Sequence, residues 1–321
     1  MPSHALVADL GGTNMRTAVV DEDGGIVNRS SLPTDAQQGK DDVVARLLGA
    51  LRDTLSAVDG RQVMGIGVSV AGPTDPETGM MYHPPNLPGW HGFSVKQALS
   101  EQFGLPVSVA NDASLAALAE HRYGAGRGYA HMVYLTISTG IGGGIIVDGE
   151  LYEGAQGLAG EIGHMTIDRC GPQCTCGNVG CLEMLASGTA VARMARERLQ
   201  SGDASVVLDS AGGDIERIDA AMVTRAARAG DEMAVRIVDE VARNLGIGIV
   251  GVVHALDPGV IVLGGGMTRE LDLFMPGIDG VLQARAIRLP EDRPLIVPAQ
   301  LGEDGGLLGA AAMAFEASEP S

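Results

Sequence analysis

The sequence predicts an α/β fold built from two similar halves. Ala5–Leu10 has the pattern of a buried strand, and the chain then passes through a glycine-rich turn, Asp9–Asn14, into a second strand at 17–20. The same plan returns at 132–147, where a strand, the turn Thr139–Gly144 and another strand follow one another. A repeated unit is more informative than either copy alone. It predicts a duplicated fold whose two phosphate-binding turns face each other across a cleft.

Strands and helices alternate along the rest of the chain, as expected of an α/β protein. Short apolar runs predict further strands at 64–70, 107–110, 260–263 and 295–299. Apolar residues at helical spacing predict helices at 41–58, 113–123, 187–200, 218–229, 232–256 and 305–315. Gly246–Gly251 matches the dinucleotide pattern G-x-G-x-x-G, but that pattern must follow a strand, and here it lies inside a predicted helix. Close packing between helices explains these small residues better.

Composition limits the classes of function. The 321 residues suffice for one large or two ordinary domains, and 45% hydrophobic with 19% charged residues describes a globular protein. A net charge of −18 argues against a nucleic-acid binder, which needs a basic surface. The start of the chain lacks the features of a signal peptide, and no stretch is apolar enough to span a bilayer. We therefore expect a cytoplasmic protein without nucleic-acid or membrane partners.

One histidine and three cysteines predict a closed tetrahedral zinc site. His164 is followed by Cys174, Cys176 and Cys181, which supply the imidazole and three thiolates of a structural site. The alternative is a pair of disulfides that includes Cys170, but disulfides belong to oxidising compartments. We interpret Cys170 as a thiol outside the metal site.

Polar side chains around the predicted metal loop suggest a ligand site. Glu161 precedes His164 and Glu183 follows the last cysteine, so both acids are held near the histidine. Asn111 and Asp112 end a predicted strand and precede a helix, where α/β sheets place their ligands. Asp112 suits a catalytic role, and its alternative is a helix N-cap. Asn86, close to the only tryptophan, either lines a pocket or packs a proline-rich loop.

Glycine-rich turns are suited to binding phosphate, because glycines let backbone N–H groups approach an anion closely. In Asp9–Asn14 the Thr13 hydroxyl adds a donor, and Asp9 is suited to hold Mg²⁺ through water. The alternative for this turn alone is an ordinary hairpin. A third turn, Gly264–Gly266, follows a strand and leaves bare backbone against which a base or ribose could lie.

Together these motifs resemble the ROK family of sugar kinases and repressors, within the superfamily that also holds actin and the large heat-shock chaperones. The resemblance covers essentially the whole chain and is most specific in Glu161-x-x-His164 and Cys174-x-Cys176-x4-Cys181-x-Glu183. Among family members the chain is most similar to bacterial ATP-dependent glucokinases. Many members carry an acidic residue where this chain has Ala110, a difference that could alter the start of the following helix.

The resemblance implies a two-lobed actin-like, ribonuclease H-like fold with a cleft between the lobes and a zinc-stabilised loop. It implies a small domain of residues 1–112 plus 302–321, a large domain of residues 113–301 and a homodimer. The implied reaction is the transfer of phosphate from MgATP to the 6-hydroxyl of glucose, with Asp112 as the general base. No P-loop is present in the sequence, so Mg²⁺, backbone amides and hydroxyls must neutralise the phosphate charge.

The resemblance also assigns the binding residues. Sugar contacts are implied for Gly72, Asn86, Asn111, Asp112, Glu161, His164 and Glu183. ATP contacts are implied for Asp9, Gly11, Gly12, Thr13, Asn14, Thr139, Gly140, Gly264, Gly265 and Gly266. Zinc ligation is implied for His164, Cys174, Cys176 and Cys181, so His164 would serve both the metal and the sugar through different ring nitrogens.

Other functions compete with glucose phosphorylation. A kinase for N-acetylglucosamine or N-acetylmannosamine would carry the same polar residues, and a polyphosphate donor is an alternative to ATP. A sugar-responsive repressor of this family needs an N-terminal helix-turn-helix, for which a first strand at Ala5 leaves no room. A sugar-binding protein without catalysis would lack the base, whereas Asp112 is present.

Overall fold

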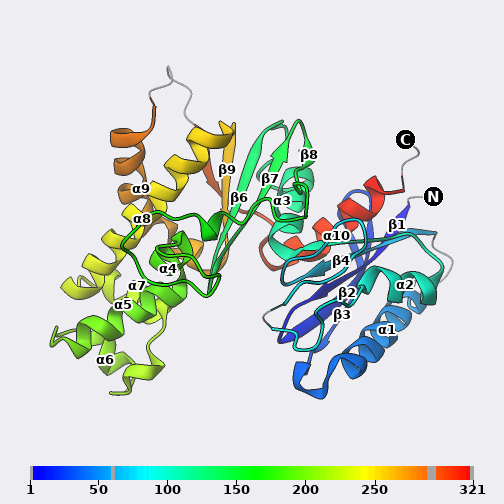
Figure 1. The fold of residues 1–321 in the computed structure, drawn as a ribbon, viewed down its shortest axis with the longest axis horizontal. Coiled ribbons are helices and arrows are strands. Elements are labelled where there is room, and N and C mark those ends of the chain that lie inside the picture. Colours follow the sequence, from blue (N-terminus) through cyan, green and yellow to red (C-terminus); the bar gives the residue numbers. More distant parts are fainter. Residues whose placement is uncertain (1–2, 59–61, 85, 288–293, 319–321) are drawn as a thin grey trace. The chain divides into compact units, whose positions relative to one another are not determined.

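The structure, a computed structural model, has the predicted α/β architecture (Figure 1). It describes residues 3–58, 62–84, 86–287 and 294–318. The chain forms two compact units, of which the first holds residues 1–134, 144–160 and 299–321. The second unit holds residues 135–143 and 161–298.

The first sheet has the strand order β3-β2-β1-β4-β5. Its strands are β1 (His4–Leu10), β2 (Asn14–Asp21), β3 (Ile26–Pro33), β4 (Val63–Val70) and β5 (Val107–Asn111). The predicted first hairpin is confirmed, since β1 and β2 pair antiparallel with Asp9 opposite Arg16. β4 pairs parallel with both β1 and β5. β3 was not predicted from the sequence, because none of its side chains is buried and it contains no run of apolar residues.

Helices of the first unit cover this sheet. They are η1 (Ala36–Gln38), α1 (Lys40–Ser56), α2 (Val95–Phe103), α3 (Asp112–Tyr123), η5 (Gly302–Asp304) and α10 (Gly305–Glu316). The backbone of α10 packs directly against β4 and α3. A Cβ added at Gly67 of β4 would lie only 1.9 Å from the Ala310 carbonyl oxygen of α10. A Cβ added at Gly309 of α10 would likewise lie 1.9 Å from the Leu115 carbonyl oxygen of α3. This packing holds α3 in the first unit, whereas the sequence analysis assigned it to the second domain.

A buried carboxylate reinforces the same region. Glu120 on α3 is 2% exposed and accepts hydrogen bonds from three backbone N–H groups. The donors are Ala125, Gln300 and Leu301, each at 2.8–2.9 Å. A buried charge is tolerated when its lone pairs are satisfied in this way. Glu120 therefore joins α3 to the chain segment that leads into α10.

The second sheet has the order β10-β9-β6-β7-β8. Its strands are β6 (Met132–Ile137), β7 (Ile141–Val147), β8 (Glu150–Leu151), β9 (Val260–Gly264) and β10 (Leu295–Pro298). β6 and β7 are neighbours joined by a short turn, so the predicted second hairpin is confirmed. β9 and β10 pair parallel.

Helices dominate the second unit. They are η2 (Ile162–His164), α4 (Leu182–Ala186), α5 (Gly188–Gln200), α6 (Val206–Ser210), η3 (Ile215–Arg217), α7 (Ala220–Arg228), α8 (Glu232–Leu256), η4 (Gly266–Glu270) and α9 (Leu271–Arg285). Ser187, Asp219 and Asp231 cap α5, α7 and α8 by accepting a backbone N–H. Gly246 and Gly248 lie inside α8 against Val281 and Leu182. The packing interpretation of the glycine pattern is therefore confirmed.

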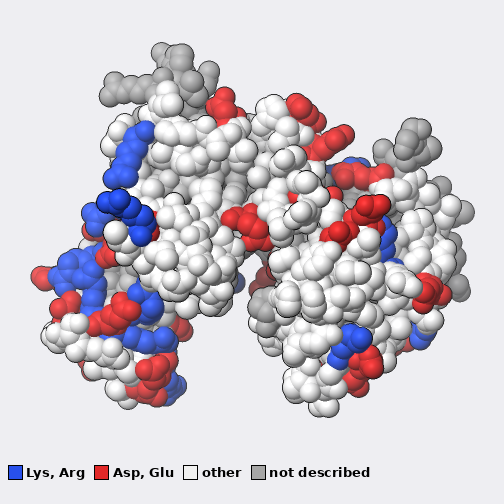
Figure 2. Space-filling model, viewed as in Figure 1, with Lys and Arg blue, Asp and Glu red and all other residues white. Residues whose placement is uncertain are grey.

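Charged side chains are mixed in sign on the face that Figure 2 shows. Over the helices of the second unit, basic and acidic side chains lie side by side. Ion pairs of the second unit include Arg193–Glu197, Arg198–Glu240 and Arg236–Asp203. Among the described residues, no helix is long and apolar enough to cross a membrane.

Candidate active site and metal centre

The four residues predicted to bind metal come together in the second unit and form what we call the His/Cys cluster: His164, Cys174, Cys176 and Cys181. Their ligand atoms all lie within 4.8 Å of one another. Cys174 Sγ is 3.7 Å from His164 Nδ1, and Cys176 Sγ is 3.7 Å from Cys181 Sγ. Sulfurs bound tetrahedrally to zinc at about 2.3 Å lie about 3.8 Å apart, and a disulfide would need about 2.05 Å. The cluster therefore has the spacing of a metal site.

The loop that carries the cluster is shaped by tight turns. The N–H of Cys174 donates to the Asn178 carbonyl at 2.8 Å, and Gly180 has φ 64°. A Cβ on Gly180 would lie 1.6 Å from the Asp168 carbonyl oxygen, so only glycine fits there. Cys170 is exposed and lies outside the cluster.

The chemistry of the thiols also favours a bound cation. Burial, and then the neighbouring Cys174 and Cys176 sulfurs, raise the pKa of the Cys181 thiol to about 12. Thiolate is the ligating form, and three thiolates at this spacing repel one another. A bound divalent cation would stabilise the thiolate form of Cys181 and reduce the repulsion between the three thiolates. The donor set therefore fits a metal ion such as zinc.

The residues of the second unit that are predicted to bind sugar fall into two groups. Glu161 Oε2 lies 3.8 Å from His164 Nε2, so Nδ1 faces the sulfurs and Nε2 faces a carboxylate. Glu183 instead points to the hairpin turn, where its Oε2 accepts the Ile141 N–H at 2.8 Å. Glu161 and His164 are thus brought together, and Glu183 joins the His/Cys cluster to residues 138–141.

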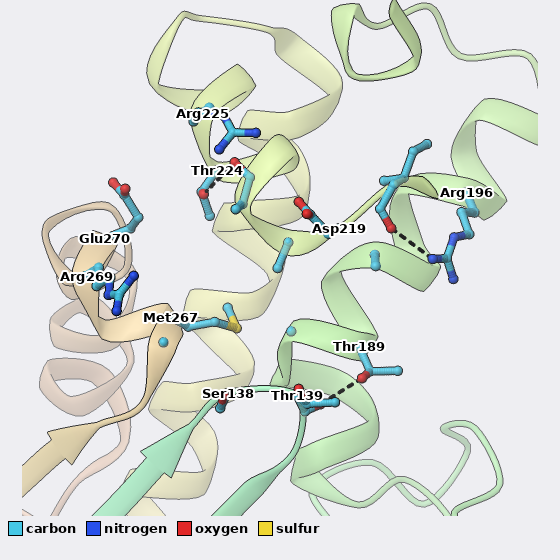
Figure 3. A pocket seen from close by; sticks show the side chains of 16 residues that line it. Ser138, Thr139, Thr189, Arg196, Asp219, Thr224, Arg225, Met267, Arg269 and Glu270 are labelled. Atoms are coloured by element: carbon cyan, nitrogen blue, oxygen red, sulfur yellow. Dashed lines mark hydrogen bonds between the residues drawn. The ribbon is translucent and has the colours of Figure 1, made fainter. Parts of the chain in front are cut away.

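We call residues 138–141 the donor turn. Within it, Ser138 N–H donates to the Gly140 carbonyl at 2.9 Å. The start of α5 holds it from outside, because Gly188 N–H donates to the Ser138 carbonyl at 2.7 Å. The Thr189 hydroxyl donates to the Thr139 carbonyl at 2.8 Å (Figure 3). The turn is therefore tied to the segment that follows the cysteine loop.

A cavity of about 620 Å³ opens beside the donor turn (Figure 3). Its walls come from the donor turn, α5, the segment at the start of α7, and η4. Of the residues predicted to bind ATP, Thr139 and Gly266 line it, whereas Gly140, Gly264 and Gly265 do not. Gly265 has φ 90°, and its missing Cβ lets η4 approach the Ile137 backbone. The cavity size suits a small-molecule ligand.

The charges in this cavity are unequally compensated. Asp219 caps α7, and Glu270 accepts a hydrogen bond from Arg228 at 3.1 Å. Arg196 on α5 donates to the backbone carbonyls of Ile215, Glu216 and Ile218, in and just after η3. Among the described residues, Arg225 and Arg269 have neither a hydrogen bond nor an ion pair from their guanidinium groups. The cavity therefore keeps uncompensated positive charge and suits an anionic ligand.

Most of the residues that line this cavity were not predicted from the sequence. In the view of Figure 3, Thr224 and Arg225 on α7 lie at the end remote from Ser138 and Thr139. These residues belong to helices whose apolar periodicity indicates only which side chains are buried. Arginines on a helix face have no characteristic spacing in the sequence. No local signal in the sequence could have identified them.

In the first unit, the predicted residues at the end of β5 lie together with Gly72. Asn111 Nδ2 donates to the Gly72 carbonyl at 3.3 Å, and Asn111 Oδ1 accepts the Ala113 N–H at 2.9 Å. Asn111 is thus the N-cap of α3, and Asp112 is the first helical residue. Asp112 Oδ1 also accepts the Ala113 N–H, at 2.8 Å.

The first glycine turn lies beside the Asn86 loop. A Cβ on Gly12 would lie 2.4 Å from the Asn86 Cβ, so glycine permits this approach. Asp9 Oδ1 accepts from the Ser69 hydroxyl at 2.7 Å, and Asp9 Oδ2 accepts from Arg16 Nε at 3.1 Å. Arg16 was not among the predicted site residues, although the tight hairpin places it directly opposite Asp9.

Comparison with known proteins assigns the family. A model of the ROK family matches residues 6–317. The chain is 35% identical to a glucokinase of Thermotoga maritima, over 98% of this chain and 99% of the relative. It is 33% identical to an N-acetylmannosamine kinase of Escherichia coli, over 97% of this chain and 98% of the relative.

A solved structure gives the same result for the fold. The ROK family glucokinase from Streptomyces griseus in complex with glucose and AMPPNP superposes with a TM-score of 0.80 at 33% identity. The match covers 98% of this chain and 99% of that one, and it confirms the predicted fold class. Family match, sequence identity and fold agree over nearly the full length, and the chain belongs to the ROK family.

Proposed function

We propose that the chain is an ATP-dependent sugar kinase that phosphorylates the 6-hydroxyl of glucose. The observation that carries this proposal is the cavity beside the donor turn. It combines two residues predicted to bind ATP, Thr139 and Gly266, with the uncompensated arginines Arg225 and Arg269. The likeness to glucokinases, one of them solved with glucose and AMPPNP, supports the same reaction.

The cavity suggests how the nucleotide binds. The donor turn offers backbone N–H groups and the Thr139 hydroxyl to phosphate oxygens, as glycine-rich turns do. The base and ribose would then extend along η4 towards α7, and Arg225 and Arg269 would add to the positive potential of the cavity, which attracts the phosphates. The first turn, residues 11–14, would contribute the remaining phosphate contacts. Asp9 would approach nucleotide-bound Mg²⁺ through water, and Mg²⁺ would neutralise phosphate charge.

Asp112 is the proposed general base. A sugar hydroxyl is almost fully protonated near neutral pH, so a carboxylate within hydrogen-bond reach is needed. Asp112 takes the proton of the 6-hydroxyl as O6 bonds to the γ-phosphorus, and the bond from that phosphorus to the bridging oxygen of ADP breaks. Sugar hydroxyls are proposed to bind Gly72, Asn86, Asn111, Glu161, His164 and Glu183.

The proposed metal is zinc, one ion per chain, held by the His/Cys cluster. With four protein ligands such a site has no open position and serves structure rather than chemistry. Ligation through Nδ1 fixes the tautomer of His164 and leaves Nε2–H as a donor. Nε2 already faces Glu161, so both side chains would be oriented for a sugar hydroxyl. A homodimer is part of the proposal, and light scattering tests it.

A coupled kinase assay with MgATP tests the reaction. Glucose, mannose, N-acetylglucosamine and N-acetylmannosamine are compared at equal concentration, with polyphosphate as a second donor. We expect glucose to have the highest kcat/KM. If only an N-acetylated sugar is phosphorylated, the proposed kinase activity stands and the proposed substrate, glucose, is replaced by that sugar. Such a result would agree with the relative named as an N-acetylmannosamine kinase. Absence of turnover on every sugar with either donor would refute the proposed function.

A further inference from the structure

We propose that Glu183 is a positioning residue that joins the His/Cys cluster to the donor turn, so that the intact cluster sets nucleotide affinity as well as sugar affinity. The proposal rests on the proposed function in one respect, since it takes residues 138–141 as the phosphate-binding turn. Every residue that it uses belongs to the second unit.

The first observation is the position of the Glu183 carboxylate. Glu183 lies two residues after the ligand Cys181, and its Oε2 accepts the Ile141 N–H at 2.8 Å. A Cβ on Gly140 would lie 2.4 Å from the same oxygen, so the carboxylate lies directly over this part of the turn. A hydrogen bond to an ionised acceptor is stronger than one between neutral groups. The bond therefore constrains the backbone at the end of the donor turn.

The second observation concerns the other end of the cysteine loop. Gly163 precedes the ligand His164, and a Cβ at Gly163 would lie 2.0 Å from the Ile141 carbonyl oxygen. The N–H of Ile141 thus faces Glu183, and its C=O faces Gly163. Ile141 is therefore held between the residues that flank the first and last ligands of the cluster.

The third observation is the path of the chain after the cluster. The segment 181–189 starts at a ligand and ends at Gly188 and Thr189, which bond the carbonyls of Ser138 and Thr139. The bonds that hold the donor turn from outside therefore come from the same segment as Cys181. Ordering a backbone costs conformational entropy, so a turn that is already fixed binds its ligand more tightly than a mobile one.

Measuring nucleotide binding in the absence of sugar distinguishes a role of Glu183 in positioning the donor turn from a role in sugar binding alone. Titration with MgAMPPNP is expected to show about tenfold weaker binding for Glu183→Ala, the effect of losing one charge-assisted hydrogen bond. Glu183→Gln keeps a carbonyl acceptor and should stay within about threefold of the parent chain. Its KM for sugar should still rise, because an amide accepts a sugar hydroxyl more weakly than a carboxylate. Glu161→Ala is the matched control, since Glu161 faces His164 and should change sugar binding alone.

Unchanged AMPPNP affinity in Glu183→Ala would overturn the proposal, as would an equal loss in Glu161→Ala. A parent chain that binds no AMPPNP would instead refute the proposed function, so the two failures are distinguishable. Cys176→Ala gives a second test, with metal content measured by mass spectrometry and folding by thermal unfolding. If it stays folded without metal, its AMPPNP affinity should also fall, and parent-like affinity would overturn the coupling.

Discussion

Glu183 Oε2 accepts the backbone N–H of Ile141 at 2.8 Å, across 42 residues of sequence. This bond joins a loop shaped by thiol and imidazole groups to a turn suited to phosphate. The proposed sugar and nucleotide contacts of the second unit therefore share one framework. A change at the His/Cys cluster is expected to reach both substrates.

Asp112→Asn should lower kcat by about 10²- to 10⁴-fold, the usual loss when a general base is removed. The amide keeps the size of the side chain, so sugar binding should stay measurable by calorimetry. Asp41→Asn is the matched control, because Asp41 is also in the first turn of a helix of the same unit and its side chain is 97% exposed. Near-normal turnover of Asp112→Asn would remove Asp112 as the base.

Cys176→Ala should lose the metal and lower the unfolding temperature by more than about 5 °C, because binding to a folded site contributes to folding free energy. Cys170→Ala makes the same chemical change four residues before the first cysteine ligand and outside the cluster. It should keep about one zinc per chain and an unchanged unfolding temperature. Equal zinc content in the two variants would contradict the assigned ligands.

Arg225→Met and Arg269→Met should each weaken AMPPNP binding about tenfold, because each removes a positive charge from the cavity. The affinity of the parent chain should also fall more steeply with added salt than that of either variant. Arg236→Met is the control, since Arg236 pairs with Asp203 and Glu232 outside the cavity. Unaltered affinity in both cavity variants would place the nucleotide elsewhere.

Gly309→Ala should destabilise the chain by about 1–3 kcal/mol, the usual cost of overpacking. The new methyl group would lie 1.9 Å from the Leu115 carbonyl oxygen, so α10 must move away from α3. Gly49→Ala makes the same change inside α1, where no atom lies within 4 Å of the new Cβ. It should be neutral or stabilising by about 0.5–1 kcal/mol. Urea unfolding compares the two, and similar midpoints would refute the packing argument.

Local pattern predicted the elements whose signals are strong. α5, α7 and α8 combine apolar periodicity with a capping side chain, and both glycine-turn hairpins stand where the sequence places them. α9 was missed, because Pro276, Gly277 and Gly280 argue against a helix. Gly277 allows α9 to pack closely against α8, since a Cβ at this position would lie 2.6 Å from the Cβ of Ala242. Tertiary packing thus overrides a weak helix propensity.

The sequence by itself determined which four residues form the His/Cys cluster, the two glycine turns and the position of Asp112 at the end of a strand. Each depends on residues close together in the chain, where spacing and turn chemistry decide the structure. Only the tertiary structure decided that Glu183 bonds Ile141 and that Arg225 and Arg269 line one cavity. Those pairings join distant segments, and they depend on how buried surfaces pack, which no local pattern encodes.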